Sequence, residues 1–337
     1  MARPLPPTFQ TIGDAAARLI AHLTETAMNA HASIPTVRSL KPHERVNAAG
    51  VYALDIDRYH SDCCIGPSIS SSGLRTIEQK SPAHYWATSY LNPRRVTEAP
   101  SEALDFGQAA HTLLLGESGF RQRFAIRPDD FPDFRTKAAQ AWREDQRAAG
   151  RVVLLPEQVE HIKGIAAALA RHPLVRQGLL QGEVERSLIW PDPAGVWLKS
   201  RPDVVPVSDG VAVDLKTAAD ASPRAMERAI LDKGYAMQGA LTGMALKAVC
   251  NIEMTAFVLV AVEKAPPYAV SIIEVDASWL GYARRQVRRA IETFARCLES
   301  GEWPAFEGEA KAFIPEWLRK RLDAETDVGL LPQEDAA

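Results

Sequence analysis

The hydrophobic pattern of this chain changes near residue 184, and that change constrains the fold more than any other feature of the sequence. Before it, apolar residues recur mostly at the spacing of amphipathic helices. Three short strand-like runs then follow at residues 185–190, 196–201 and 211–217, separated by turn residues at 192–195 and 209–210. The pattern predicts an antiparallel meander of three strands in a chain that is otherwise mostly helical.

The Asp-Gly pair at 209–210 also predicts how the last two strands pair. If it forms a two-residue hairpin turn, counting outward places Val205 opposite Asp214 and Asp203 opposite Lys216. Side chains alternate between the two faces of a strand. We therefore expect Asp203, Asp214 and Lys216 to project from one face of the sheet.

The opposite face of the same strand is apolar, with Val211, Val213 and Leu215 at alternate positions. These side chains are expected to hold the strand against a core. Pro206 lacks a backbone N–H, and a bulge there would shift the register by one residue.

Two carboxylates beside an ammonium group have two interpretations. A divalent cation, Mg2+ or Mn2+, would offset the repulsion between Asp203 and Asp214, and Lys216 would lie beside a scissile phosphate, as phosphodiester hydrolysis requires. Alternatively, Asp203 and Lys216 form an ordinary cross-strand salt bridge and Asp214 is solvated. The strand pattern alone leaves both open.

Elsewhere the pattern predicts helices, which begin and end at capping or breaking residues. We expect them at residues 12–32, 72–81, 83–91, 101–115, 134–149, 157–169, 224–247 and 278–299. Two further strands, 254–263 and 268–275, should form a hairpin around Pro266 and Pro267. Gly107 and His111 are four residues apart and should share a helix face.

Composition narrows the classes of partner. The chain has 337 residues, 46% hydrophobic and 24% charged, which is typical of a soluble globular protein. Its net charge of -3 excludes general coating of nucleic acid, so any DNA contact must be local. Arg284, Arg285, Arg288 and Arg289 either line a DNA channel or pair on the surface with residues such as Glu292.

Cysteine usage and hydropathy bear on location. The cysteines at 63, 64, 250 and 297 lack the C-x2-C spacing of structural zinc and many iron–sulfur sites, so we expect free thiols in a reducing compartment. The longest strongly apolar stretch, 256–262, is too short to cross a bilayer. We therefore expect a cytoplasmic protein with no membrane partner.

The sequence resembles a known nuclease family. Arg201-Pro202-Asp203, ten intervening residues and then Asp214-Leu215-Lys216 resemble the PD-(D/E)XK core, and more narrowly the exonuclease VIII (RecE-type) nuclease domain of phage recombination systems. Flanking segments resemble the same family in the same order. They are residues 69–74, 80–85, 106–111, 185–190, 234–238 and 302–304.

The resemblance implies a mixed α/β fold, a restriction-endonuclease-like core in which helices flank a central mixed sheet. It places the nuclease domain at 51–320, while the residue pattern predicts an extension at 1–50 with one helix and a linker and an acidic flexible tail at 321–337.

By the same resemblance, Asp203 and Asp214 are the principal metal ligands and Lys216 is the catalytic ammonium. The Leu215 carbonyl would bind the same ion, and His111 and Glu185 would complete the site. Without the resemblance, His111 reads as a core histidine and Glu185 as an exposed strand residue.

The resemblance also suggests where DNA would be contacted. Tyr235 and Gln238 would lie on the helix above the site, although Thr242 stands where related nucleases often carry tyrosine. Tyr235 alone is as consistent with packing on a helix surface. Ser72, in a run of three serines at a predicted helix start, would either bind a phosphate or cap the helix.

The expected function is therefore a Mg2+-dependent exonuclease that degrades linear double-stranded DNA from its ends and leaves 3′ single-stranded overhangs, with Mn2+ as a substitute ion. A homo-oligomeric ring and a single-strand annealing protein are the partners that the resemblance implies. The alternatives are a Cas4-like or structure-specific endonuclease of the same superfamily, and a non-catalytic module that binds DNA ends.

Overall fold

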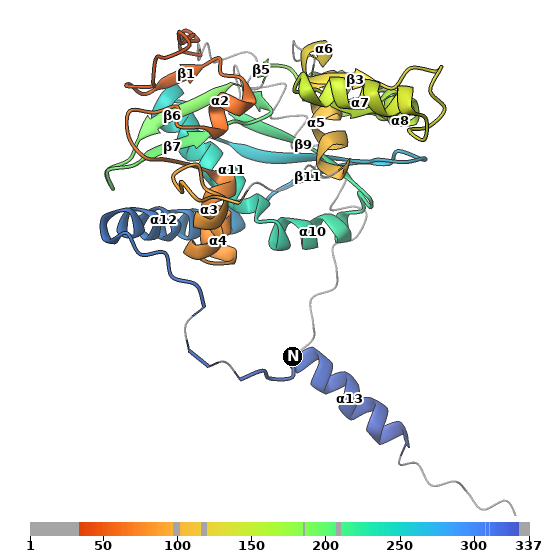
Figure 1. The fold of residues 1–337 in the computed structure, drawn as a ribbon. Coiled ribbons are helices and arrows are strands. Elements are labelled where there is room, and N and C mark those ends of the chain that lie inside the picture. The colour runs from red at the N-terminus through yellow and green to blue at the C-terminus, as the bar shows by residue number, and fades with distance from the viewer. Residues whose placement is uncertain are drawn as a thin grey trace, which may run out of the picture. The chain divides into compact units, whose positions relative to one another are not determined.

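Two eight-residue strands, β9 (Val211–Ala218) and β10 (Ala256–Glu263), form the centre of the computed structural model (Figure 1). They are parallel, with Asp214 opposite Leu259 and Lys216 opposite Ala261. Almost every residue of β10 is buried, as expected for a parallel strand that is covered on both faces. Three strands complete this five-stranded sheet, in the order β11 (Val270–Glu274), β10, β9, β8 (Val204–Val205), β5 (Glu183–Val184).

The structure describes residues 34–96, 102–115, 120–184, 186–206, 210–306, 308–309 and 311–329; side chains are described for all of these except 102–104 and 325–329. Within this part of the chain, a four-stranded sheet has the order β1 (Gly50–Tyr52), β6 (Ser187–Pro191), β7 (Trp197–Ser200), β2 (Ser68–Ser70). A parallel pair, β3 (Phe124–Ile126) and β4 (Val152–Leu154), forms a third sheet.

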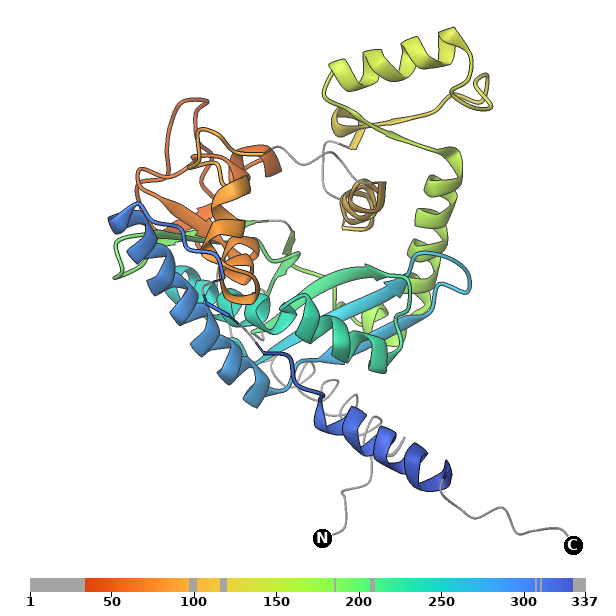
Figure 2. The ribbon, with the colours of Figure 1, turned by 60° about the horizontal axis from the view of Figure 1, so that its bottom comes forward.

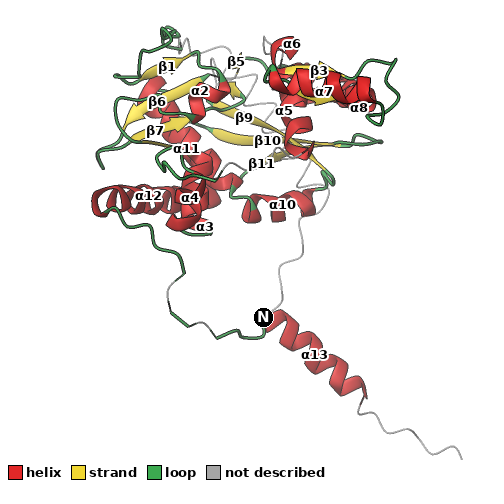
Figure 3. Ribbon diagram, viewed as in Figure 1, coloured by secondary structure: helices red, strands yellow, loops and turns green. Residues whose placement is uncertain are grey.

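Helices flank the strands, as Figure 3 shows. Their bounds are α2 (Ile56–His60), α3 (Ser71–Gln79), α4 (Pro82–Thr88), α5 (Glu102–Leu114), α6 (Phe120–Arg123), α7 (Lys137–Ala148), α8 (Pro156–Arg171), α9 (Pro173–Arg176), α10 (Pro223–Asp232), α11 (Tyr235–Ala245), the π-helix η1 (Leu246–Cys250) and α12 (Ala277–Ser300). A further helix, α13 (Glu316–Gly329), belongs to a separate unit. The mixed sheets with flanking helices confirm the predicted fold class.

The two faces of the central sheet pack against different helices (Figure 2). Val211, Val213 and Leu215 belong to a core with α5 and α8, as predicted for the apolar face of β9. Ala212, on the other face, belongs to a larger core with α3, α10, α11 and α12. The strand is therefore the middle layer between two helical layers.

The predicted meander is wrong at one point. β6 and β7 do form an antiparallel pair, with Leu188 opposite Ser200, but β7 and β9 lie in different sheets. Between β7 and β8, Arg201 and Pro202 belong to no strand. Because Pro202 cannot donate to a ladder, it ends pairing there, and the chain enters the second sheet at β8.

The predicted register is also corrected. The hairpin count places Val204 opposite Leu215, whereas the structure pairs Val204 with Val213, a shift of two residues. A shift of two preserves which face each side chain occupies, because the side-chain period of a strand is two. The expected clustering of Asp203 and Asp214 therefore survives the error in register.

The helix predicted over 224–247 is divided. Gly234 has a φ of 64° and separates α10 from α11. The positive φ favours glycine, and a Cβ at this position would also displace the side chains of Arg75 and Gln79. The hairpin of β10 and β11 and the helix α12 agree with the predicted segments.

Packing near the predicted domain boundaries at residues 51 and 320 is as follows. Val46, inside the predicted extension, is fully buried and bridges to Cys64, so packing against the domain begins before residue 51. The predicted helix at 12–32 lies outside the described residues. Among the described residues, those up to 303 form one compact unit and those from 304 onward form another, and α13 covers the first part of the predicted tail. No helix among the described residues is long and apolar enough to cross a membrane.

Candidate metal-dependent active site

β9 presents Asp214 and Lys216 on the face that α11 covers. Asp214 is 1% exposed, and its Oδ2 lies 2.5 Å from Lys216 Nζ. The ammonium is therefore held by the carboxylate two residues before it on the same strand. This pairing differs from the salt bridge between Asp203 and Lys216 that the alternative interpretation of the strand pattern required, and Asp214 is not solvated.

Asp203 is the residue just before β8, and its carboxylate lies beside the same part of β9. Its Oδ2 accepts a hydrogen bond of 2.6 Å from the backbone N–H of Leu215, between the two functional side chains of β9. The carboxylate is 7% exposed. Arg201 also has a structural role, because its Nη1 donates to the Leu54 carbonyl at 2.6 Å and so ties the motif to the segment after β1.

His111 approaches from α5. Its Nδ1 lies 3.4 Å from Asp203 Oδ1. Gly107 lies one turn earlier, and a Cβ at this glycine would lie 3.8 Å from Thr217 Oγ1, so this face of α5 packs closely on β9. The predicted shared face of Gly107 and His111 thus turns toward β9 and Asp203.

Gln238 and Tyr235, on α11, contact the same charged pair. Gln238 Nε2 donates to Asp214 Oδ1 at 2.5 Å, and Gln238 Oε1 accepts from Lys216 Nζ at 3.2 Å. Lys216 Nζ lies 4.6 Å from the centroid of the Tyr235 ring, a cation–π contact. The sequence suggested DNA contacts for these residues, and their roles in orienting Asp214 and Lys216 were missed.

The electrostatics of the two carboxylates differ. Burial and then the charge of Asp203 raise the pKa of Asp214, and Lys216 only partly opposes this. Burial acts to raise the pKa of Asp203 as well, but His111, Lys216 and the Leu215 N–H outweigh it and lower that pKa. Asp203 is therefore the carboxylate that ionises readily, and its charge opposes ionisation of Asp214.

The two basic groups are stabilised in their charged forms. Burial acts to lower the pKa of Lys216, but the carboxylates of Asp214 and Asp203 outweigh it and raise that pKa. Burial likewise acts to lower the pKa of His111, but the negative charge of Asp203 outweighs it and raises that pKa. In this arrangement cationic side chains compensate the carboxylate charge.

The donor set fits a hard divalent cation. Asp203 and Asp214 supply oxygen ligands of the kind that Mg2+ prefers. A buried carboxylate whose ionisation is opposed by its neighbour is also a group that a divalent cation would stabilise. Among the described residues, however, no three His, Cys, Asp or Glu side chains form a metal-binding group by themselves. Glu185, the remaining predicted acidic ligand, lies outside the described residues.

Ser72 does not contact the acidic pair. It is exposed near the start of α3, and its Oγ lies 3.1 Å from Ser70 Oγ. Ser70 occupies the N-cap position but its side chain makes no capping hydrogen bond. Helix capping was one of the two roles predicted for the serines at the start of α3, and the side chain of Ser70 does not cap this helix.

The basic residues of α12 pair on the surface in two of the four cases. Arg288 donates to Asp192 at 2.6 and 2.9 Å and contacts Glu292, while Arg289 pairs with Glu78. Of the two alternatives for this cluster, pairing with acidic residues is therefore observed for Arg288 and Arg289, although Asp192 itself is buried.

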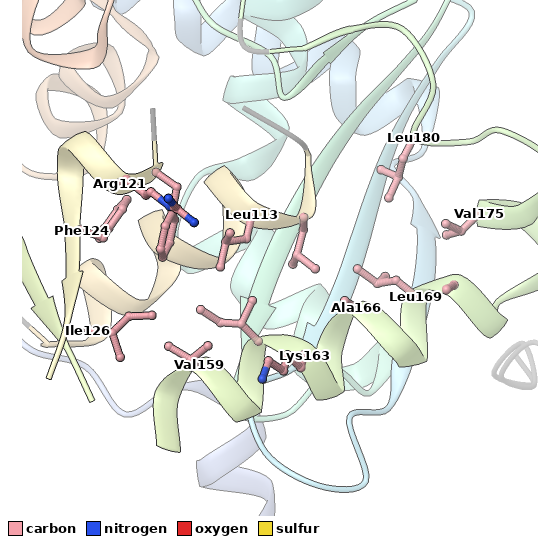
Figure 4. Close-up of a pocket in the computed structure, with 14 residues that line it drawn as sticks. Leu113, Arg121, Phe124, Ile126, Val159, Lys163, Ala166, Leu169, Val175 and Leu180 are labelled. Carbon is pink, nitrogen blue, oxygen red and sulfur yellow. The ribbon is translucent and has the colours of Figure 1, made fainter. Parts of the chain in front are cut away.

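A cavity among the described residues lies apart from this site. It has a volume of about 760 Å³ and lies between α5, β3 and α8, lined mainly by aliphatic and aromatic side chains such as Leu113, Phe124, Ile162 and Leu169 (Figure 4). The described residues that line it include no carboxylate, and it shares none of them with the group of Asp203, Asp214 and Lys216.

Comparison with known proteins agrees with this geometry. Residues 70–314 match the model of a family described as a PDDEXK-like domain of unknown function (DUF3799). The crystal structure of a "putative exonuclease" from Eubacterium rectale is similar in fold, with a TM-score of 0.53 and 17% identity; the match covers 78% of this chain and 96% of that one. No curated protein matches the chain. Because the family model spans most of the chain, this protein belongs to the PDDEXK-like family, and its fold is that of the PD-(D/E)XK nucleases.

Proposed function

We propose that this protein is a metal-dependent deoxyribonuclease that degrades linear double-stranded DNA from its ends and leaves 3′ single-stranded overhangs. The observation that carries the proposal is the convergence of Asp203, Asp214 and Lys216 at one buried point, where Gln238 orients two of them. Mg2+ is the proposed ion, and Mn2+ should substitute for it.

The residues divide the chemistry between them. Asp203 and Asp214 would hold the ion, with the Leu215 carbonyl, His111 and Glu185 as further ligands. When bound, the ion would polarise the scissile phosphate and lower the pKa of a bound water. Lys216 holds a positive charge against Asp214, and its ammonium would donate to negative charge that develops on the phosphate. Burial strengthens this interaction by excluding water.

The biological setting is part of the same proposal. A cytoplasmic ring of identical subunits around the duplex would let a chain with a net charge of -3 keep hold of DNA. The overhang would then pass to a single-strand annealing protein. Tyr235, Gln238 and Ser72 are the proposed contacts to the DNA strand.

Digestion of a duplex labelled on one strand end tests the proposal. Linear DNA with Mg2+ should release labelled nucleotides progressively, whereas a closed circular duplex should stay intact. Asp214→Ala and Lys216→Ala should abolish release, and Lys163→Ala, an exposed residue of α8 paired with Glu160, serves as the matched control. Cutting of the closed circle would favour the structure-specific endonuclease. Equal release of nucleotides by wild type and both site variants would contradict a nuclease at this site, and no release by any of the three would favour a non-catalytic DNA-binding module.

The Cas4-like alternative depends on an iron–sulfur cluster. Cys63 and Cys64 are adjacent and buried, with their sulfur atoms 3.8 Å apart, whereas Cys297 lies in α12 and Cys250 at the end of η1. Cys63 and Cys64 pack in a core with β1 and α2, while Cys250 packs against another core. This distribution does not favour a four-cysteine cluster.

A further inference from the structure

Cys63 and Cys64 form a pair of buried thiols that the proposed nuclease chemistry does not use. Their sulfur atoms lie 3.8 Å apart, and the two residues are 2% and 0% exposed. The backbone around them is held by Val46, whose N–H donates to the Cys63 carbonyl at 2.8 Å and whose carbonyl accepts from the Ile65 N–H at 3.0 Å. The backbone therefore keeps the two sulfur atoms close together.

A buried ammonium group lies beside this pair. Lys199, on β7, is 2% exposed, and its Nζ lies 3.9 Å from Cys63 Sγ. The same Nζ donates to the carbonyls of Tyr59, at 2.6 Å, and Ser61, at 3.4 Å. No carboxylate among the described residues forms an ion pair with Lys199. Because a buried charge is costly without a counter-charge, a thiolate at Cys63 would supply the partner that Lys199 lacks.

The two thiols differ in acidity and in access. The hydrogen bond with Cys64 and the charge of Lys199 lower the pKa of the Cys63 thiol, although burial opposes this. The same hydrogen bond and burial raise the pKa of Cys64. Cys63 also lines a cavity of about 440 Å³ beside α2, whereas Cys64 is not among the described residues that line it. Cys63 is therefore the thiolate that a small solute reaches first, and Cys64 is a protonated thiol behind it.

We propose that Cys63 and Cys64 are a site of reversible oxidation by hydrogen peroxide, with Cys63 as the attacking thiolate and Cys64 as the resolving thiol. The Cys63 sulfur attacks one peroxide oxygen, the O–O bond breaks, hydroxide leaves and Cys63 becomes a sulfenic acid. The Cys64 sulfur then attacks the Cys63 sulfur, the S–O bond breaks, and the hydroxyl leaves as water with the Cys64 proton. The first hydroxide takes up the proton that Cys63 gave up, so the pair loses two electrons and two protons, and the peroxide becomes two waters.

Oxidation of the reduced full-length chain, without DNA or metal, tests this inference. The protein is exposed to a small excess of hydrogen peroxide, catalase removes the peroxide, and the remaining thiols are alkylated after unfolding in guanidinium. Peptide mass spectrometry then measures the fraction of each cysteine that is still alkylated. Cys250 and Cys297 are controls within the same chain, because burial raises the pKa of both thiols.

Wild type should lose alkylation at Cys63 and Cys64 together, at least about tenfold faster than at the two control cysteines. The product should be one peptide with a disulfide between the adjacent residues, and a dithiol reductant should restore both thiols. If Cys63 and Cys64 stay alkylated, react no faster than the controls, or form disulfides with other chains instead, the inference is wrong.

Three variants, each checked for folding by thermal unfolding, test the assigned roles. Cys64→Ser should accumulate a sulfenic acid at Cys63 that a cyclic diketone traps, whereas Cys63→Ser should leave Cys64 reduced. Lys199→Met should slow oxidation of Cys63 about tenfold, and Lys163→Met, at an exposed position of α8, should not. Oxidation of Cys64 in Cys63→Ser, or an unchanged rate in folded Lys199→Met, would overturn these roles. None of these results depends on whether the protein cleaves DNA.

Discussion

Gln238 donates a hydrogen bond of 2.5 Å from its amide nitrogen to Asp214 Oδ1, while its amide oxygen accepts one of 3.2 Å from Lys216. One side chain of α11 thus contacts both functional groups of β9. Because Asp214 is almost fully buried, its orientation depends on such partners rather than on water.

Replacing Gln238 with Met should keep the volume of the side chain and remove both hydrogen bonds. We expect kcat to fall about 10- to 100-fold, as for other partners that orient metal ligands, with a smaller change in KM for DNA. Single-turnover digestion of a linear duplex measures this. Gln140→Met, at an exposed position of α7, is the control. A higher KM with unchanged kcat would instead assign Gln238 to DNA binding.

Asp203→Asn should abolish stabilisation by metal while preserving the fold. The asparagine oxygen can still accept from the Leu215 N–H, but the charge that holds a cation is lost. For wild type, Mn2+ at 100 times its Kd should raise the free energy of unfolding by about 2.7 kcal/mol. Thermal unfolding with and without Mn2+ measures the difference. Equal Mn2+ shifts in Asp203→Asn and wild type would place the ion elsewhere.

Gly239→Ala should destabilise the protein and impair the site together. Gly239 is buried beside Gln238, and a Cβ there would meet the Phe257 ring on β10. Overpacking of this kind costs about 1 to 3 kcal/mol and should move α11 away from the sheet. Gly281→Ala is the matched control, because a Cβ at Gly281 meets nothing and helix α12 should gain about 0.5 to 1 kcal/mol. Urea unfolding of both variants distinguishes packing from a general effect of alanine.

Arg288→Met and Arg289→Met should differ although the residues are adjacent. Arg288 pairs with Asp192, whose side chain is 3% exposed, so its loss leaves a buried carboxylate without this partner. Because removing one partner of a buried ion pair is strongly destabilising, we expect the free energy of unfolding to fall by about 2 kcal/mol or more. Arg289 is 61% exposed and its partner Glu78 is 11% exposed, both more than in the Arg288–Asp192 pair, so the loss of Arg289 should cost less, about 1 kcal/mol. Urea unfolding measures both, and weaker DNA binding by folded Arg289→Met would revive a DNA-channel role.

The amino-acid sequence predicted much of this architecture because its signals are local. Alternation along β9 separates the charged face from Val213 and Leu215, and this separation holds even though the hairpin register is shifted by two residues. The prediction of a three-stranded meander was wrong because the pattern of a strand does not indicate which sheet the strand joins. Pro202 ends one pairing, and the parallel partner β10 comes from much later in the chain.

The sequence by itself determined the residues of the Arg201–Asp203 and Asp214–Lys216 motifs, the face that Asp214 and Lys216 share and the class of ion that suits them. Only the tertiary structure decided that Lys216 pairs with Asp214, that Gln238 bridges them, and that His111 faces Asp203. The physical reason is that side-chain alternation is a property of one strand. Contacts between β9, α11 and α5 depend instead on how separate elements pack into a common core.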